Sequence, residues 1–290
     1  MAKENYMSLR GQLRSDVKFL MDEKTGVEKT AVFTLHTIRR DTYDRAGNLN
    51  PKWDKPLIVT SDQEMIRQAK KLKKHDIVEV KGTFETKFVT KHKQCPHCGE
   101  INFIKTNSQT IYPSFIGTIA HLESDTEGLK YLIETAEISN IAKVMGRVCS
   151  KDEEIITAQT DQGEFYTRYQ LAVNRKLFHK DSEDYEDHTD YPFVFSYGNV
   201  ALDDQAVLKQ GALIYVDGYV HTMIKDTITP CEYCGNEFAY KEQRMNLTPY
   251  ANEYLRDFKM DVLEQTHPVT TNNDVSTNEP EEAHDGDIGE

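Results

Sequence analysis

A segment of this chain occurs twice, and this internal repeat constrains the fold more than any other feature of the sequence. The stretch at 74–99, KHDIVEVKGTFETKFVTKHKQCPHCG, corresponds to QGALIYVDGYVHTMIKDTITPCEYCG at 210–235, displaced by 136 positions. The same offset aligns 32–113 with 168–249 without a gap. Because a fixed offset over this length indicates a duplicated structural unit, we expect two similar domains in tandem.

The extent of the repeat sets the expected domain boundaries. We predict a first domain over 1–122, a linker over 123–137, a second domain over 138–258 and a C-terminal tail over 259–290. The tail is acidic and poor in apolar residues, which predicts disorder. With 290 residues, 38% of them hydrophobic, the chain can form two small cores.

Each repeat contains short alternating segments bounded by Gly, Asp and Asn, as is typical of β-strands. In the second repeat these segments are 141–148, 166–174, 193–197, 212–223 and 242–247. Tyr169, Leu171 and Val173 alternate with more polar residues, so one strand face is expected to be buried. A short helix ending at Gly211 is expected between the third and fourth strands. This order of five strands and a helix predicts a mainly-β chain of two tandem OB-fold barrels.

Charge is distributed unevenly along the chain. Residues 1–125 carry a net charge of +5, whereas 126–250 and 251–290 each carry −9, giving the total of −13. This asymmetry suggests that mainly the first repeat binds a polyanionic partner. The alternative is that the charges are ordinary surface charges that keep the protein in solution. No apolar run is long enough to span a membrane, and the N-terminus lacks the apolar core of a signal peptide, so we expect a cytoplasmic protein.

Both repeats carry a CxxCG motif between the fourth and fifth expected strands, formed by Cys95 and Cys98 and by Cys231 and Cys234. Two thiolates separated by two residues can bind one tetrahedral ion at about 2.3 Å. Because cytoplasmic thiols stay reduced, paired CxxC motifs indicate a metal more often than a disulfide. The sequence therefore predicts structural Zn²⁺.

Two ligand sets could complete the zinc coordination. Either all four cysteines share one ion, or each motif recruits nearby histidines. The first repeat offers His92 and His97, but the second has only His221 upstream of its motif. This difference favours the shared four-cysteine site.

Four segments of the second repeat resemble the bacterial single-stranded DNA-binding protein family. These are GRVCSKD, YQLAVNRK, YPFVFSYGN and LKQGALIYVDGYVHTM, within Ile141 to Met223. The resemblance implies OB-folds that bind single-stranded DNA without strong sequence preference in replication, recombination or repair, and tandem repeats that act as a built-in dimer. The family has no zinc knuckle at this place, and its acidic tail ends in an apolar tip, whereas this chain ends DGDIGE.

The resemblance also implies residues that stack on bases. The family's stacking positions correspond to Phe178, Tyr191 and Tyr197. The equivalent positions of the first repeat hold no aromatic residue, so Trp53 is expected to substitute there. Single-strand binders also need cations that follow the phosphates. Basic residues at strand ends and in the loop between the second and third strands suit this role: Arg39, Arg40, Lys52, Lys55, Arg175 and Lys176.

Other functions stay open at this point. A stacking groove also accepts RNA, so an RNA-binding or transcription-associated zinc/OB protein is one alternative. A protein-interaction scaffold with an unused groove is another. No phosphate loop, nucleophile motif or HExxH occurs in the sequence, so an enzyme is not expected. Replication or recombination proteins are expected to contact the acidic tail, homo-oligomers are expected, and the divergence of the repeats would suit a phage protein.

Overall fold

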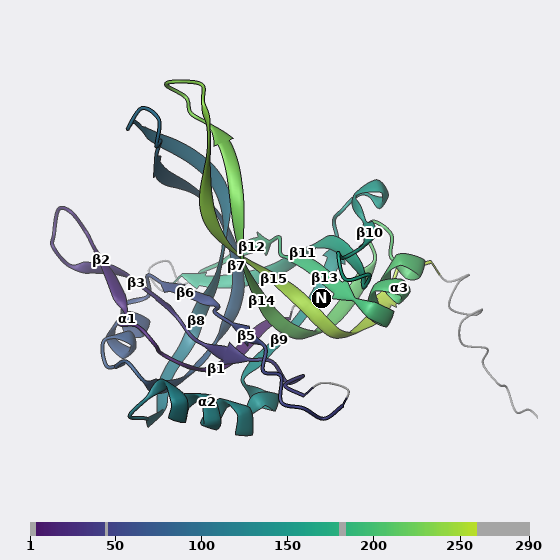
Figure 1. Ribbon diagram of the computed structural model, residues 1–290, viewed down its shortest axis with the longest axis horizontal. Coiled ribbons are helices and arrows are strands. Elements are labelled where there is room, and N and C mark those ends of the chain that lie inside the picture. Colours follow the sequence, from purple (N-terminus) through teal and green to yellow (C-terminus); the bar gives the residue numbers. More distant parts are fainter. Residues whose placement is uncertain (1–3, 44–45, 180–183, 260–290) are drawn as a thin grey trace, which may run out of the picture.

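The computed structural model describes residues 4–43, 46–179 and 184–259, without the side chains of 176–187 (Figure 1). The predicted tail therefore lies almost wholly outside the described residues. Most described residues are in strands, so the prediction of a mainly-β chain is confirmed. No helix among the described residues has the length and apolar character needed to cross a membrane.

The first repeat follows the order expected of its sequence. Its elements are β1 (Asn5–Gln12), β2 (Lys18–Met21), β3 (Glu28–Thr34), β4 (Thr37–Ile38), β5 (Trp53–Asp54), β6 (Leu57–Thr60), α1 (Gln63–Ala69), β7 (Asp76–Gln94) and β8 (Ile101–His121). β1 pairs with β7, β7 with β8, β8 in parallel with β6, and β6 with β3. A bridge between Gln12 and His36 returns the path to β1. Five strands thus close in the pairing order of an OB barrel, with α1 between the third and fourth of them.

The second repeat has the same arrangement. Its elements are α2 (Asp125–Glu134) and η1 (Ala136–Ile138) in the predicted linker, then β9 (Asn140–Val148), η2 (Asp152–Glu154), β10 (Ile156–Gln159), β11 (Phe165–His179), β12 (Asp184–Asp190), β13 (Phe193–Tyr197), α3 (Gly198–Val207), β14 (Leu213–Pro230) and β15 (Glu237–Arg256). β9, β11, β13, β15 and β14 pair in a closed order, again with one parallel contact between the third and fifth strands.

The two repeats form one body because β1 pairs antiparallel with β9. This pairing joins them into one continuous sheet, and one hydrophobic core cluster contains residues from both. Tyr169, Leu171 and Val173 are fully buried in it, as their alternation predicts. The helix α2 packs Leu132 against Ile38 and Trp53 at the first repeat.

The fourth and fifth strands of each repeat continue far beyond the barrel. We call 86–110 the first arm and 222–246 the second arm; both project from the same side of the body (Figure 1). The sequence predicted strands only to 223 and from 242, because these outer residues lack a regular buried face. Gly218 marks the bulge where the second arm leaves its barrel, and a Cβ there would lie 2.1 Å from the Thr248 carbonyl oxygen.

The residues after β11 form the strand β12, which pairs antiparallel with the end of β11. The sequence DYEDHTD has no apolar alternation, so this strand left no hydrophobic signal to detect. The second and third barrel strands of the repeat are therefore joined through a β-hairpin.

A buried ion pair links the second repeat to the first arm. Arg175 Nε donates to Asp190 Oδ2 at 2.5 Å, and its Nη2 donates to Glu85 Oε1 at 2.8 Å. Asp190 Oδ1 accepts the backbone N–H of Thr86 at 2.8 Å. Asp190 is fully buried, and only 6% of the Arg175 side chain is exposed. The second repeat thus fixes the base of the first arm.

The same contact recurs with the repeats exchanged. Arg39 Nε donates to Asp54 Oδ2 at 2.7 Å, and Asp54 Oδ1 accepts the backbone N–H of Thr222 at 2.7 Å. His221 Nδ1 lies 2.7 Å from Arg39 Nη2, in the place that Glu85 occupies in the other pair. Burial raises the pKa of Asp54, but contacts with His221 and Arg39 outweigh burial and lower it. Each repeat therefore fixes the arm of the other, and we call these contacts the reciprocal ion pairs.

A buried carboxyl in the second repeat makes stability depend on pH. Asp204 is fully buried and accepts hydrogen bonds from Asn252 at 2.9 Å and from the Tyr254 hydroxyl at 2.8 Å. Burial raises its pKa from 3.8 to about 6. Because the folded state favours the protonated carboxyl, its contribution to the stability of the fold is fully present below pH 3.8. This contribution is lost as the pH rises through about 6.

We therefore expect Asp204→Asn to gain stability relative to the native chain as pH rises. Between about pH 4 and about pH 8 the difference in unfolding free energy should shift by about 3 kcal/mol in favour of the variant. Urea unfolding at several pH values measures this shift. A constant difference across the range would contradict the raised pKa.

Candidate nucleic-acid interface and cysteine cluster

Aromatic and basic side chains cover the outer face of β11 and β13. In FVFSY at 193–197, alternation turns Val194 and Ser196 inward, where both are fully buried, and leaves the three aromatic residues outside. On β11, Arg168 stands opposite Phe195 and its guanidinium lies 5.6 Å from the Phe193 ring. The outer face therefore offers flat rings beside a cation, which is the combination that stacks on bases.

A groove of about 670 Å³ lies where this face meets the two arms. Its lining includes three phenylalanines and four cations: Phe88, Phe193, Phe195, Lys105, Arg168, Lys225 and Arg244. None of the described residues that line it is acidic. Phe88 projects from the first arm with 88% of its surface exposed, which is unusual for a large apolar side chain.

The first repeat lacks an equivalent of this surface. At the offset of 136, Arg168, Phe193 and Phe195 correspond to Val32, Leu57 and Val59. An aliphatic surface cannot stack on bases as an aromatic one does, so the two barrels differ in the chemistry of the same face.

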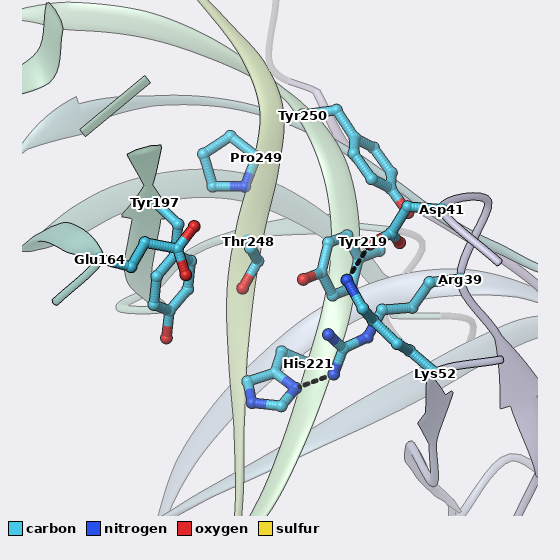
Figure 2. A pocket seen from close by; sticks show the side chains of 10 residues that line it. All are labelled: Arg39, Asp41, Lys52, Glu164, Tyr197, Tyr219, His221, Thr248, Pro249 and Tyr250. Carbon is cyan, nitrogen blue, oxygen red and sulfur yellow. Dashed lines mark hydrogen bonds and ion pairs between the residues drawn. The ribbon is translucent and has the colours of Figure 1, made fainter. Parts of the chain in front are cut away.

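A second hollow, of about 250 Å³, lies on the same side of the second repeat, against the loop of the first (Figure 2). β13 and β15 pass from the groove into this hollow, which Tyr197, Tyr219 and Tyr250 line. Arg39 enters from the first repeat, with its guanidinium 4.7 Å from the Tyr219 ring. Burial raises the pKa of Tyr219 to about 12, so this hydroxyl stays protonated at neutral pH.

The basic residues expected to contact phosphates lie in different environments. Arg39 and Arg175 belong to the reciprocal ion pairs, so their charges already have buried partners. The guanidinium of Arg40 lies 3.6 Å from the Tyr250 ring, and the exposed Lys52 pairs with Asp41 at 2.6 Å. Lys52 and Arg39 line the hollow of Figure 2.

Lys55 and the residues expected to stack on bases also lie at separate places on the protein. Lys55 is exposed beside the second arm, where its backbone N–H donates to Thr222 Oγ1. Trp53 is half-buried and contacts the α2 cluster, and Tyr191 is 44% exposed. Tyr197 lines the hollow. The predicted contacts at Lys176 and Phe178 fall where side chains are not described.

Sequence reasoning missed all seven of these groove residues: Phe88, Lys105, Arg168, Phe193, Phe195, Lys225 and Arg244. The alternation in FVFSY was a usable signal for the two phenylalanines on β13. The sequence holds no comparable signal for the arm residues, because they reach the groove only when both arms lie against the face of β11 and β13.

The four CxxC cysteines meet at the tips of the two arms. All four Sγ atoms lie within 4.8 Å of one another. Cys95 Sγ is 3.9 Å from Cys234 Sγ, and Cys98 Sγ is 3.6 Å from Cys231 Sγ. Bonds of about 2.3 Å in a tetrahedron place sulfur atoms about 3.8 Å apart. The cluster is therefore close enough to bind one metal ion, as the shared-site hypothesis expects.

The local chemistry also fits a cation. Although burial raises the pKa of the Cys231 thiol, backbone N–H groups of its own turn and the Asn102 amide lower it to about 6. The backbone N–H of Glu100 lowers the pKa of Cys98, but burial and the neighbouring thiols outweigh it and raise the pKa to about 12. A Cys231 thiolate beside a Cys98 thiol that resists ionisation is a charge state that a divalent cation relieves.

Comparison with known proteins identifies the fold. No protein-family model and no curated protein sequence matches the chain. Wild-type single-stranded DNA-binding protein from Thermus aquaticus matches with a TM-score of 0.55 at 16% identity, over 89% of this chain and 95% of that one. A deletion mutant of the same protein matches with a TM-score of 0.52 at 19% identity, over 90% of this chain and 100% of that one.

The match spans both repeats and the body that they form. The chain therefore has the fold of a single-stranded DNA-binding protein, and the resemblance expected from the sequence is confirmed at the level of the fold.

Proposed function

We propose that this chain binds single-stranded DNA without strong sequence preference and acts as a binding protein in replication or recombination. The observation that carries the proposal is the groove beside the second repeat, where three phenylalanines and four cations gather and no described lining residue is acidic, with Arg244 alone of the four cations paired to Glu242 next to the groove. Rings give sequence-tolerant stacking of about 1–3 kcal/mol per base, and cations follow the phosphates. The likeness of the fold to single-stranded DNA-binding proteins supports the same function.

In this proposal the repeats have different roles. The aromatic face belongs to the second repeat, whereas the first repeat contributes the wall formed by Phe88 and Lys105. The acidic net charge of the second repeat does not oppose this role, because binding depends on the local groove. The tail's charge supports displacement of DNA or recruitment of replication and recombination proteins.

The test is a titration of fluorescently labelled oligo(dT) by anisotropy at several salt concentrations. If the four groove cations each neutralise one phosphate, the logarithm of the affinity should fall with the logarithm of salt with a slope of about −3. Oligo(rU) of the same length is the matched ligand. Tighter binding of oligo(rU) would redirect the proposal to RNA, and salt-independent or absent binding of both would remove it.

We also propose that the arm-tip cysteines hold one structural Zn²⁺. Native mass spectrometry should show one ion per chain. Cys98→Ser should lose it, whereas Cys149→Ser, which changes a thiol outside the cluster, should retain it. Retention by both variants, or two ions per chain, would contradict a shared site.

A further inference from the structure

The nucleic-acid groove has walls from two separate arms. The first arm contributes Phe88 and Lys105, and the second contributes Lys225 and Arg244. Arg168 and the phenylalanines of β13 form the floor. The spacing of the arms therefore sets the width of the groove and the distance between its cations.

Every described hydrogen bond between the arms involves at least one side chain. Within the described residues no backbone ladder joins them, because β9 and β1 lie between β14 and β7 in the sheet. Midway along the arms, Glu242 accepts hydrogen bonds from Lys91 at 2.8 Å and from Thr106 at 3.1 Å. At the tips the contacts centre on the four cysteines, where Asn102 accepts the backbone N–H of Glu232 at 2.8 Å.

The charges of the arms oppose their approach. Lys91 and Lys105 on the first arm face a second arm that carries Lys225 and Arg244 around the groove. Glu242, nearly fully buried between the arms, balances part of this charge through Lys91 and Arg244. Convergent cations repel one another until an anion arrives, so closed arms require contacts elsewhere. The other described contacts are a hydrogen bond from the Met245 N–H to Gln109 Oε1 at the base of the arms, and contacts that run from the Lys93–Tyr240 pair outward to the tips.

We propose that a thiophilic divalent cation in the four-cysteine cluster controls nucleic-acid binding by holding the arms closed over the groove. This inference rests on the proposed function. With the ion bound, the arm cations are pre-organised for phosphates, which lowers the cost of binding. Without it the tips separate and the arm cations move apart, while both barrels and the aromatic floor persist.

The experiment compares the full chain as zinc-loaded protein, after removal of zinc with a chelator, and after reloading. Affinity for oligo(dT) and its salt slope are measured in each state, with thermal unfolding monitored in parallel. Loss of two phosphate contacts should weaken binding about ten- to thirtyfold near physiological salt and make the slope shallower by about 1.4. Reloading should restore both values. Cys98→Ser should behave as stripped protein, and Cys149→Ser as loaded protein.

Each result decides the question. Equal affinity and slope with and without zinc would overturn the inference and leave the proposed function intact. No binding in either state would reject the proposed function instead. Loss of the cooperative thermal transition on stripping would also overturn the inference, because the ion would then support the barrels rather than the arms.

Discussion

Replacing Phe193 by leucine and Phe195 by valine is expected to weaken oligo(dT) binding about a hundredfold, if each ring stacks on one base and contributes about 1.4 kcal/mol. The new residues are those that the first repeat carries at Leu57 and Val59. The same fold already accommodates them on the same face, so the Tm should change little. Anisotropy titration at one salt concentration measures the loss.

Phe115→Leu is the matched control, since this ring is 45% exposed on β8 and lies outside the groove. Its affinity should equal that of the native chain. Native affinity in the double variant would contradict the groove assignment. A loss restricted to Tyr191→Ala with Tyr197→Ala would instead move the binding path to the stacking positions that the sequence predicted.

The order of the fold was accessible from the sequence because it depends on local signals. Alternation located the barrel strands, and the offset of 136 carried each assignment from one repeat to the other. The thiols were found for a similar reason, since CxxC spacing brings two ligands to one ion without help from the fold. The arms were not found, because strands that are exposed on most of their surface have no regular apolar period.

The groove was not predictable because it depends on the position of the arms against β11 and β13. Net charge pointed to the first repeat, but it averages over a whole surface. Four cations from four strands, β8, β11, β14 and β15, gather at the groove although the second repeat is acidic as a whole. The expectation that Arg39 and Arg175 contact phosphates took no account of the buried carboxylates that both side chains pair with.

The sequence did contain a signal for the buried partners of these two arginines. Arg39 and Arg175, and likewise Asp54 and Asp190, are identical at the offset although the repeats have diverged. Identical polar residues in two diverged copies indicate a shared structural contact. The distance in sequence, 90 residues between Arg175 and Glu85, concealed that each contact crosses to the other repeat.

Arg175→Met is expected to destabilise the chain by about 3–5 kcal/mol, because it leaves buried carboxylates without their cation. Asp190 is fully buried and would keep the hydrogen bonds from Thr86 and the contact with the His188 ring at 3.5 Å. Glu85 would keep Lys87 at 2.9 Å. For a body of this size the Tm should fall by about 6–20 °C. Urea unfolding gives the free energy directly.

The control is Lys52→Met, which removes an exposed partner of Asp41 and should cost less than about 1 kcal/mol. Adding Asp190→Asn and Glu85→Gln to Arg175→Met should restore most of the lost stability, since neutral amides need no cation and can still accept the Thr86 N–H. If Arg175→Met cost no more than Lys52→Met, the reciprocal ion pairs would not be what joins the repeats, and the β1–β9 pairing with its shared core would have to do so alone.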